Sequence, residues 1–139
     1  MNTANKIDSS PSILCIDSLK LGQDYFINVQ SNGCFHQSNL SLVISKETNG
    51  YFACFKMKGN IENKNVNTTL KKIKLGDYQI DSVRNFERQL ISVSASHFIC
   101  TTVDVYTLSI DKLSKIYTVN NCDWKGIGKL VGILFHNTN

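Results

Sequence analysis

Alternation between apolar and polar positions marks the clearest pair of strands in the chain. Leucine and isoleucine recur at every second position from Leu40 to Ile44, and the alternation resumes from Tyr51 to Met57. This period of two is typical of strands with one buried face. Residues 47–50 separate the two runs and end in Asn-Gly, the strongest short-range signal for a hairpin. We therefore expect the two runs to form a β-hairpin.

Further strands are expected near the start and the end of the chain. The run Tyr25–Val29 is apolar and β-favouring, and Ser31-Asn32-Gly33 follows it with residues that tolerate positive φ in a turn. β-Branched and aromatic residues return over Phe98–Ile110. Lys115–Val119 is predicted to pair with that segment across a turn at residues 111–114, which makes a second hairpin.

The hydrophobic period changes to three and four residues between Asp77 and Ser94, which predicts an amphipathic helix with Gly76 or Asp77 as its N-cap. A second helix is expected to begin near Asp123, although each glycine within it weakens a helix by up to about 1 kcal/mol relative to alanine. The apolar stripe of the first helix consists of Ile80, Val83, Phe86, Leu90 and Val93. Its other faces carry Asp81, Arg84, Glu87 and Arg88. The apolar positions of the second helix are Trp124, Ile127, Leu130, Val131 and Leu134.

The predicted elements follow one another as strands, helix, strands and helix. This order favours an α+β fold in which an antiparallel sheet is built from two hairpins and two helices pack on one face. Pro11 is the only proline, and no repeat or linker divides the chain. We therefore expect a flexible N-terminal tail at residues 1–11 and a single α+β domain at residues 12–139. A long loop is predicted at Gly59–Thr69, which is rich in Asn, Lys and Thr.

The mildly positive charge of the chain narrows the classes of partner. Fifteen Lys and Arg oppose eleven Asp and Glu, which gives a net charge of +4, and most of the excess is lysine scattered between Lys56 and Lys74. Nucleic-acid binders usually add clustered arginines, whereas arginine occurs here only at Arg84 and Arg88, so we disfavour nucleic acid. An acidic protein partner fits the same charge.

The N-terminal residues bear on where the protein is located. No apolar run approaches the roughly eighteen residues of a membrane span, and Met1–Ser10 lacks the basic start and apolar middle of a signal peptide. We therefore expect no membrane span and, for the chain as written, a cytoplasmic location. The alternative is a periplasmic location, with the polar N-terminal residues as a tether that remains after an export signal is removed.

The cysteines argue against a metal site and leave a disulfide open. They are five in number and lack the CxxC spacing of zinc sites, so we expect no metal. Cys15 and Cys54 lie in apolar alternating runs, where a thiol is most often a small buried hydrophobe. Cys34, Cys100 and Cys122 lie at the edges of predicted elements, where a bridge can form in an oxidising compartment.

Cys100 and Cys122 are the candidate disulfide because they flank the second predicted hairpin. If Ile110 lies opposite Lys115, however, Cys100 lies several residues beyond the point opposite Cys122, and the chain near Cys122 must bend back. Closing a loop of about twenty residues contributes roughly 3 kcal/mol through restriction of the unfolded chain. In a reducing cytoplasm both residues stay as thiols, so this bridge depends on export.

A candidate recognition patch comes from the two most distinctive segments of the chain and consists of Asp104, Tyr106, Asp123 and Trp124. Tyrosine and tryptophan suit such a patch because they give large contact areas at low entropy cost. His36, which follows a cysteine by two residues, is a further candidate for partner contact. It does not predict a metal site, since no third or fourth ligand stands at a recognisable spacing. The structural alternative makes Asp123 a helix cap and Trp124 a core residue.

Catalytic motifs are missing from the sequence. A nucleophile with a base, paired carboxylates in a pocket or a phosphate-binding glycine loop would each need a recognisable spacing. Gly126 and Gly128 are only a fragment of a glycine motif, inside a predicted helix. We therefore expect no catalytic residues and no cofactor.

Three segments resemble a pattern of small, uncharacterised bacterial single-domain proteins. They are Ser-Asn-Gly-Cys-Phe-His at residues 31–36, Cys-Thr-Thr-Val-Asp-Val-Tyr at residues 100–106 and Cys-Asp-Trp-Lys-Gly at residues 122–126. The resemblance spans most of the chain after Asp24 and implies an exported, periplasmic protein. By analogy, small basic α+β domains without catalytic motifs are also similar to immunity or inhibitor proteins, which block a toxin by surface complementarity.

Together these observations predict a non-enzymatic protein-binding module. The specific expectation is an immunity or inhibitor protein that neutralises a bacterial toxin, with an acidic toxin domain as the partner. The alternative is an exported ligand-binding or envelope-associated domain, and a small enzyme is the third choice.

Overall fold

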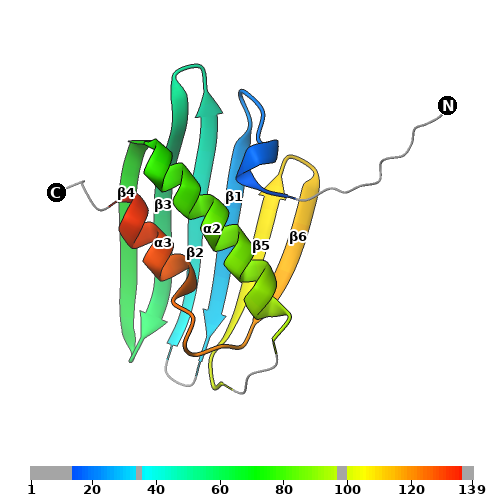
Figure 1. Cartoon of the computed structure of the whole chain (residues 1–139). Helices are drawn as coiled ribbons and strands as arrows, with labels where there is room; N and C mark the ends of the chain where they lie inside the picture. Colours follow the sequence, from blue (N-terminus) through cyan, green and yellow to red (C-terminus); the bar gives the residue numbers. More distant parts are fainter. Residues whose placement is uncertain (1–13, 34–35, 97–99, 136–139) are drawn as a thin grey trace.

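A computed structural model describes residues 14–33, 36–96 and 100–135 of the chain (Figure 1). They form a six-stranded antiparallel sheet with the strand order β4-β3-β2-β1-β5-β6. The strands are β1 (Asp24–Asn32), β2 (His36–Glu47), β3 (Gly50–Ile61), β4 (Lys64–Leu75), β5 (Val103–Ile110) and β6 (Leu113–Val119). The helices are the short 3-10 helix η2 (Ile16–Ser18) before β1, α2 (Asp77–Ser94) between β4 and β5, and α3 (Gly126–Leu134) after β6.

Strand β1 pairs with β2 and β5, and its side chains alternate between the core and solvent. Tyr25, Ile27 and Val29 are each at most 2% exposed. Ile27 lies opposite Leu42 of β2 and Leu108 of β5, which are also buried. Because opposite residues of paired strands point to the same side, the apolar positions of these three strands share one face of the sheet.

The two longer helices pack against this apolar face. Figure 1 shows α2 running obliquely across the sheet, with α3 beside the N-terminal half of α2. Val83, Phe86 and Leu90 of α2 belong to the same hydrophobic cluster as Leu130 and Leu134 of α3 and the buried residues of β1. The three- and four-residue spacing of the apolar positions in α2 explains this packing, because it places them in one stripe.

The predicted α+β fold with an antiparallel sheet is confirmed, and so is the hairpin of β2 and β3. The sheet is larger than two hairpins, however. Strands β1 to β4 follow one another as a four-stranded meander, and β5 of the second hairpin pairs with β1. Strand β4 is therefore an addition to the strands that the sequence predicts.

The prediction of a long loop at Gly59–Thr69 is wrong. Strand β3 continues to Ile61 and β4 begins at Lys64, so that only Glu62 and Asn63 turn the chain, both with positive φ. Polar and charged residues face solvent along much of β4, which is an edge strand. Lysines on an edge strand hinder pairing with other chains. A composition that is typical of a loop thus belongs to a protected edge of the sheet.

Two further expectations concern the ends of the chain. Helix α3 begins at Gly126 and not near Asp123, and no side chain caps it, so Asp123 is not its cap. The flexible tail expected at residues 1–11 lies outside the described residues.

Candidate functional site

Tyr106 lies in the core and not on an exposed recognition surface. Its side chain is 1% exposed, and it lies opposite Val29 on the apolar face of the sheet. The Ile127 backbone N–H donates a hydrogen bond to the Tyr106 hydroxyl oxygen at 3.2 Å, and burial raises the pKa of Tyr106 to about 12. The hydroxyl therefore ties the first turn of α3 to β5.

Trp124 packs beside Tyr106 in the layer between the helices and the sheet. Its ring stacks on Phe86 with 5.7 Å between the centroids, and it lies 5.6 Å from the Tyr106 ring. The indole N–H donates to Gln89 Oε1 at 2.9 Å. The structure thus brings the two aromatic members of the predicted patch together, and their contacts hold the segment before α3 against α2.

The other predicted contact residues do not join these aromatic rings in one exposed surface. Asp104 is half-buried, and its Oδ1 accepts a hydrogen bond from the Ser31 hydroxyl at 2.6 Å. Asp123 is exposed in the segment before α3. The backbone of His36 begins β2, whereas its side chain lies outside the described part of the structure.

Gly126 lies where the aromatic rings meet the start of α3. Its φ is +54°, and a Cβ at this position would overlap the Tyr106 hydroxyl oxygen. We expect Gly126→Ala to lower the free energy of unfolding by about 2 kcal/mol, because it adds both backbone strain and overpacking. Urea denaturation measures this change.

The matched control is Gly128→Ala in the same helix. A Cβ at Gly128 meets nothing within 4 Å, and the alanine should raise stability by up to about 1 kcal/mol through helix propensity. Equal stability of the Gly126 and Gly128 variants would contradict the role given to Gly126.

Cys100 and Cys122 are bridged, with Cα atoms 5.8 Å apart, a separation that suits a disulfide. The register of the second hairpin explains why the chain needs no sharp bend. The hairpin turns through two residues and not four, so Ile110 lies opposite Leu113 and not Lys115. This shift brings Cys100 close to the position opposite Cys122.

The bridge can be measured by intact mass. We expect denatured, non-reduced protein to take up three alkyl groups, since five cysteines minus the bridged pair leave three, and reduced protein to take up five. Cys100→Ser frees the partner thiol, so all four remaining cysteines should react without reduction. Five alkyl groups on the non-reduced wild type would refute the bridge.

A buried carboxylate joins three elements beneath η2. Glu87 of α2 is 7% exposed, and its Oε2 accepts hydrogen bonds from the Ile16 backbone N–H and the Tyr25 hydroxyl, each at 2.7 Å. Burial raises the pKa of Glu87 to about 7, against the lowering effect of these two hydrogen bonds. Burial and the neighbouring Glu87 also raise the pKa of Tyr25. The enclosed carboxylate therefore ties η2, β1 and α2 together.

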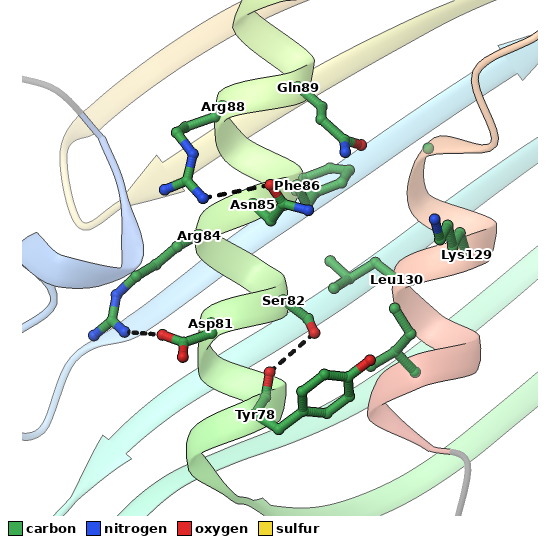
Figure 2. A pocket seen from close by; sticks show the side chains of 12 residues that line it. Tyr78, Asp81, Ser82, Arg84, Asn85, Phe86, Arg88, Gln89, Lys129 and Leu130 are labelled. Atoms are coloured by element: carbon green, nitrogen blue, oxygen red, sulfur yellow. Dashed lines mark hydrogen bonds and ion pairs between the residues drawn. The ribbon is translucent and has the colours of Figure 1, made fainter.

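A groove of about 470 Å³ lies between α2 and α3 (Figure 2). Figure 2 shows Tyr78 and Ser82 of α2 on the side of the helix that faces Lys129 and Leu130 of α3. The Ser82 hydroxyl donates to the Tyr78 carbonyl oxygen at 2.9 Å, and the Gln89 side chain at the upper end of the groove accepts the Trp124 hydrogen bond. Several polar groups of the groove therefore have internal partners.

The arginines that line this groove are also engaged. Arg84 pairs with Asp17 of η2 at 2.9 Å and with Asp81 of its own helix, and these interactions raise its pKa. Arg88 donates to Asn85 Oδ1 at 3.3 Å. Figure 2 shows both arginine side chains extending away from α3. The groove thus offers a ligand few unengaged charged groups.

The opposite face of the sheet carries a second hollow, of about 430 Å³. Its polar lining residues come from β1, β2, β3 and β5, and we call them the amide–lysine face: Asn28, Gln30, Asn39, Ser41, Lys56, Lys58 and Thr107. The strand register arranges most of them in two rows, Asn28-Ser41-Lys56 and Gln30-Asn39-Lys58. These residues alternate along β1 with the buried ones, so they point away from the helices.

The amide–lysine face differs from the groove in its unused bonding capacity. Within residues 14–33, 36–96 and 100–135, its side chains have no hydrogen-bond or ion-pair partner. Lys56 and Lys58 line the hollow, and no carboxylate does. Sequence reasoning missed this face, although polar residues at every second position from Asn28 to Asn32 mark it. The arrangement can bind carboxylates through the lysines and peptide groups through the amides.

Two classes of site are not found in the part of the chain that the structure describes. No three His, Cys, Asp or Glu side chains there lie together as ligands for a metal ion. No helix there has both the length and the apolar content that a membrane crossing requires. Comparison with known proteins adds no relative: no family model, no curated protein and no solved structure matches the chain.

Proposed function

We propose that this chain is a non-enzymatic protein-binding module that binds an acidic protein segment on its amide–lysine face. In this role it would act as an immunity or inhibitor protein that neutralises a toxin by covering it. One observation carries the proposal: polar side chains that have no partner among the described residues gather on one face of the sheet, with two lysines and no carboxylate among the residues that line its hollow.

The chemistry of the face suits a protein partner better than a small substrate. Asn and Gln side chains both donate and accept hydrogen bonds, so they can pair with the peptide groups of an extended segment. Lys56 and Lys58 supply positive charge that steers an acidic partner and favours it over a basic one. The side chains stand on paired strands, which lowers the entropy cost of binding because the backbone is already ordered.

The test compares two charge-reversal variants in a pull-down from native lysate. Lys56→Glu/Lys58→Glu alters the amide–lysine face, and Lys125→Glu/Lys129→Glu makes the same charge change at exposed lysines near α3. We expect wild type and the α3 variant to retain the same acidic protein, and the face variant to lose it. With the purified partner, the face variant should bind at least about tenfold more weakly, and salt should weaken wild-type binding.

The outcomes separate the proposal from its competitors. A partner that binds the face variant as tightly as wild type would overturn the proposed surface. Retention of nucleic acid in place of protein through Lys56 and Lys58 would overturn the proposed class of partner. Neutralisation is tested by co-expressing the chain with the captured protein: if that protein is toxic, wild type should restore growth and the face variant should not.

The second candidate is an exported ligand-binding domain, and two observations favour it. The Cys100–Cys122 bridge suits an oxidising compartment such as the periplasm, and the groove between α2 and α3 has the volume of a small-molecule site. This candidate predicts a bound small molecule in the native protein. Its release on denaturation, detected by mass spectrometry, together with loss of binding in the α3 variant, would favour this function over protein binding.

A further inference from the structure

The two edges of the sheet are protected to different degrees. Strand β4, at one edge, carries four lysines in its sequence KNVNTTLKKIKL, and its pairing with β3 is interrupted by a register shift between Ala53 and Phe55. Lysines and irregular pairing are two means by which proteins prevent an edge strand from adding another strand. Strand β4 is therefore a poor template for a further chain.

Strand β6, at the other edge, is less protected. It pairs with β5 without a register shift, and Lys115 is its single lysine. Two large apolar side chains on this strand are exposed, Leu113 at 57% and Ile116 at 63%. Figure 1 shows β6 as the outermost strand at its end of the sheet, and among the described residues only β5 pairs with it. Its outward N–H and C=O groups can therefore pair with another strand.

We propose that β6 pairs antiparallel with β6 of a second copy of this chain, with Ile116 of each copy on the two-fold axis. The two sheets then join into one continuous sheet. This inference does not rest on the binding proposed for the amide–lysine face, because none of the residues that line the hollow belongs to β6, although Ile116 lies opposite Thr107 on the same side of the sheet.

The sequence of β6 is self-complementary in this register. With Ile116 on the axis, Ile116 lies opposite its own copy, Ser114 lies opposite Thr118, and Leu113 lies opposite Val119. Apolar residues thus meet apolar residues and hydroxyls meet hydroxyls, which are favourable cross-strand pairs.

The charge of Lys115 disfavours the neighbouring register that has Lys115 on the axis. Within one copy the Lys115 Nζ lies 5.9 Å from the centre of the Tyr117 ring, so the two side chains already interact as a cation and an aromatic ring. With Ile116 on the axis, each Lys115 also lies opposite Tyr117 of the second copy. If Lys115 were on the axis, two ammonium groups would face each other directly, which destabilises a strand pair.

Charged substitutions of Ile116, the residue on the axis, test the proposal on the full chain. Sedimentation equilibrium between about 1 μM and 1 mM should show wild type as a dimer at the higher concentrations. Ile116→Lys and Ile116→Glu each place like charges on the axis, and each should need at least about tenfold higher concentration to associate. An equimolar mixture of the two should form a heterodimer, because the opposite charges then meet.

Leu21→Lys is the matched control, since Leu21 is also exposed, at 60%, but lies outside β6; it should associate like wild type. A monomeric wild type over the whole range, or variants that dimerise like wild type, would overturn the proposal. A mixture that stays monomeric would overturn the register. If an Ile116 variant fails to fold by circular dichroism, amide exchange on wild type decides: protection of β6 that decreases on dilution supports the dimer, and unchanged protection refutes it.

Discussion

Phe86→Ala should lower the free energy of unfolding by about 3–5 kcal/mol, the usual cost of removing a buried aromatic ring. Phe86 is 5% exposed, and its ring lies 5.9 Å from that of Tyr106 and 5.7 Å from that of Trp124. Its loss would leave a cavity at the point where α2, β5 and the segment before α3 meet. Urea denaturation followed by the fluorescence of Trp124, the only tryptophan, measures this change.

Ile91→Ala provides the control on the same helix. Ile91 is 48% exposed, so its truncation should change stability by less than about 0.5 kcal/mol. A loss under about 1 kcal/mol for Phe86→Ala would show that the stripe of α2 is not part of the core.

Elements that depend on nearby residues could be predicted from the sequence. The hairpin of β2 and β3 follows from alternation on both sides of Asn49-Gly50, and α2 follows from its apolar spacing and the Gly76 cap. Strand β4 could not be recognised in the same way. Its Asn- and Lys-rich composition reflects its place at the edge of the sheet, and that place is determined by tertiary structure.

The burial of Tyr106 could have been predicted from the sequence. Tyr106 lies two residues from Leu108 and four from Ile110, so all three point to the same face of β5, and that face is buried. This alternation predicts that the Tyr106 side chain lies in the core. The amide–lysine face could not be predicted in this way. Its polar residues become neighbours only through the order of β1, β2, β3 and β5 in the sheet, and the sequence does not reveal that order.

Glu87 shows a different limit of sequence reasoning. In the helical pattern it falls outside the apolar stripe, where a carboxylate is expected to be solvated. In the structure η2 and β1 cover it, and Ile16 and Tyr25 supply its hydrogen bonds. These contacts join residues far apart in the chain, which no local pattern reports. Their consequence is a marked pH dependence of stability.

The sign of this dependence follows from the direction of the pKa change. The pKa of Glu87 rises from 4.5 to about 7 on folding, chiefly because burial disfavours the charged form. Asp17 raises it further, whereas Arg84 lowers it. Between these two pH values the folded state holds a proton that the unfolded state has released, so stability falls as the pH rises. The contribution of Glu87 should be constant below the lower value and above the higher one.

We therefore expect Glu87 to reduce the free energy of unfolding by about 3 kcal/mol between pH 4.5 and about 7. Glu87→Gln keeps the shape of the side chain and an oxygen that accepts hydrogen bonds from Tyr25 and Ile16, but it cannot ionise. Urea denaturation of both proteins at several pH values gives two stability curves, and their difference removes the contribution of every other carboxylate. That difference should change by about 3 kcal/mol in favour of the variant as the pH rises through this range. Parallel curves would show that the pKa of Glu87 does not change on folding and would contradict the prediction.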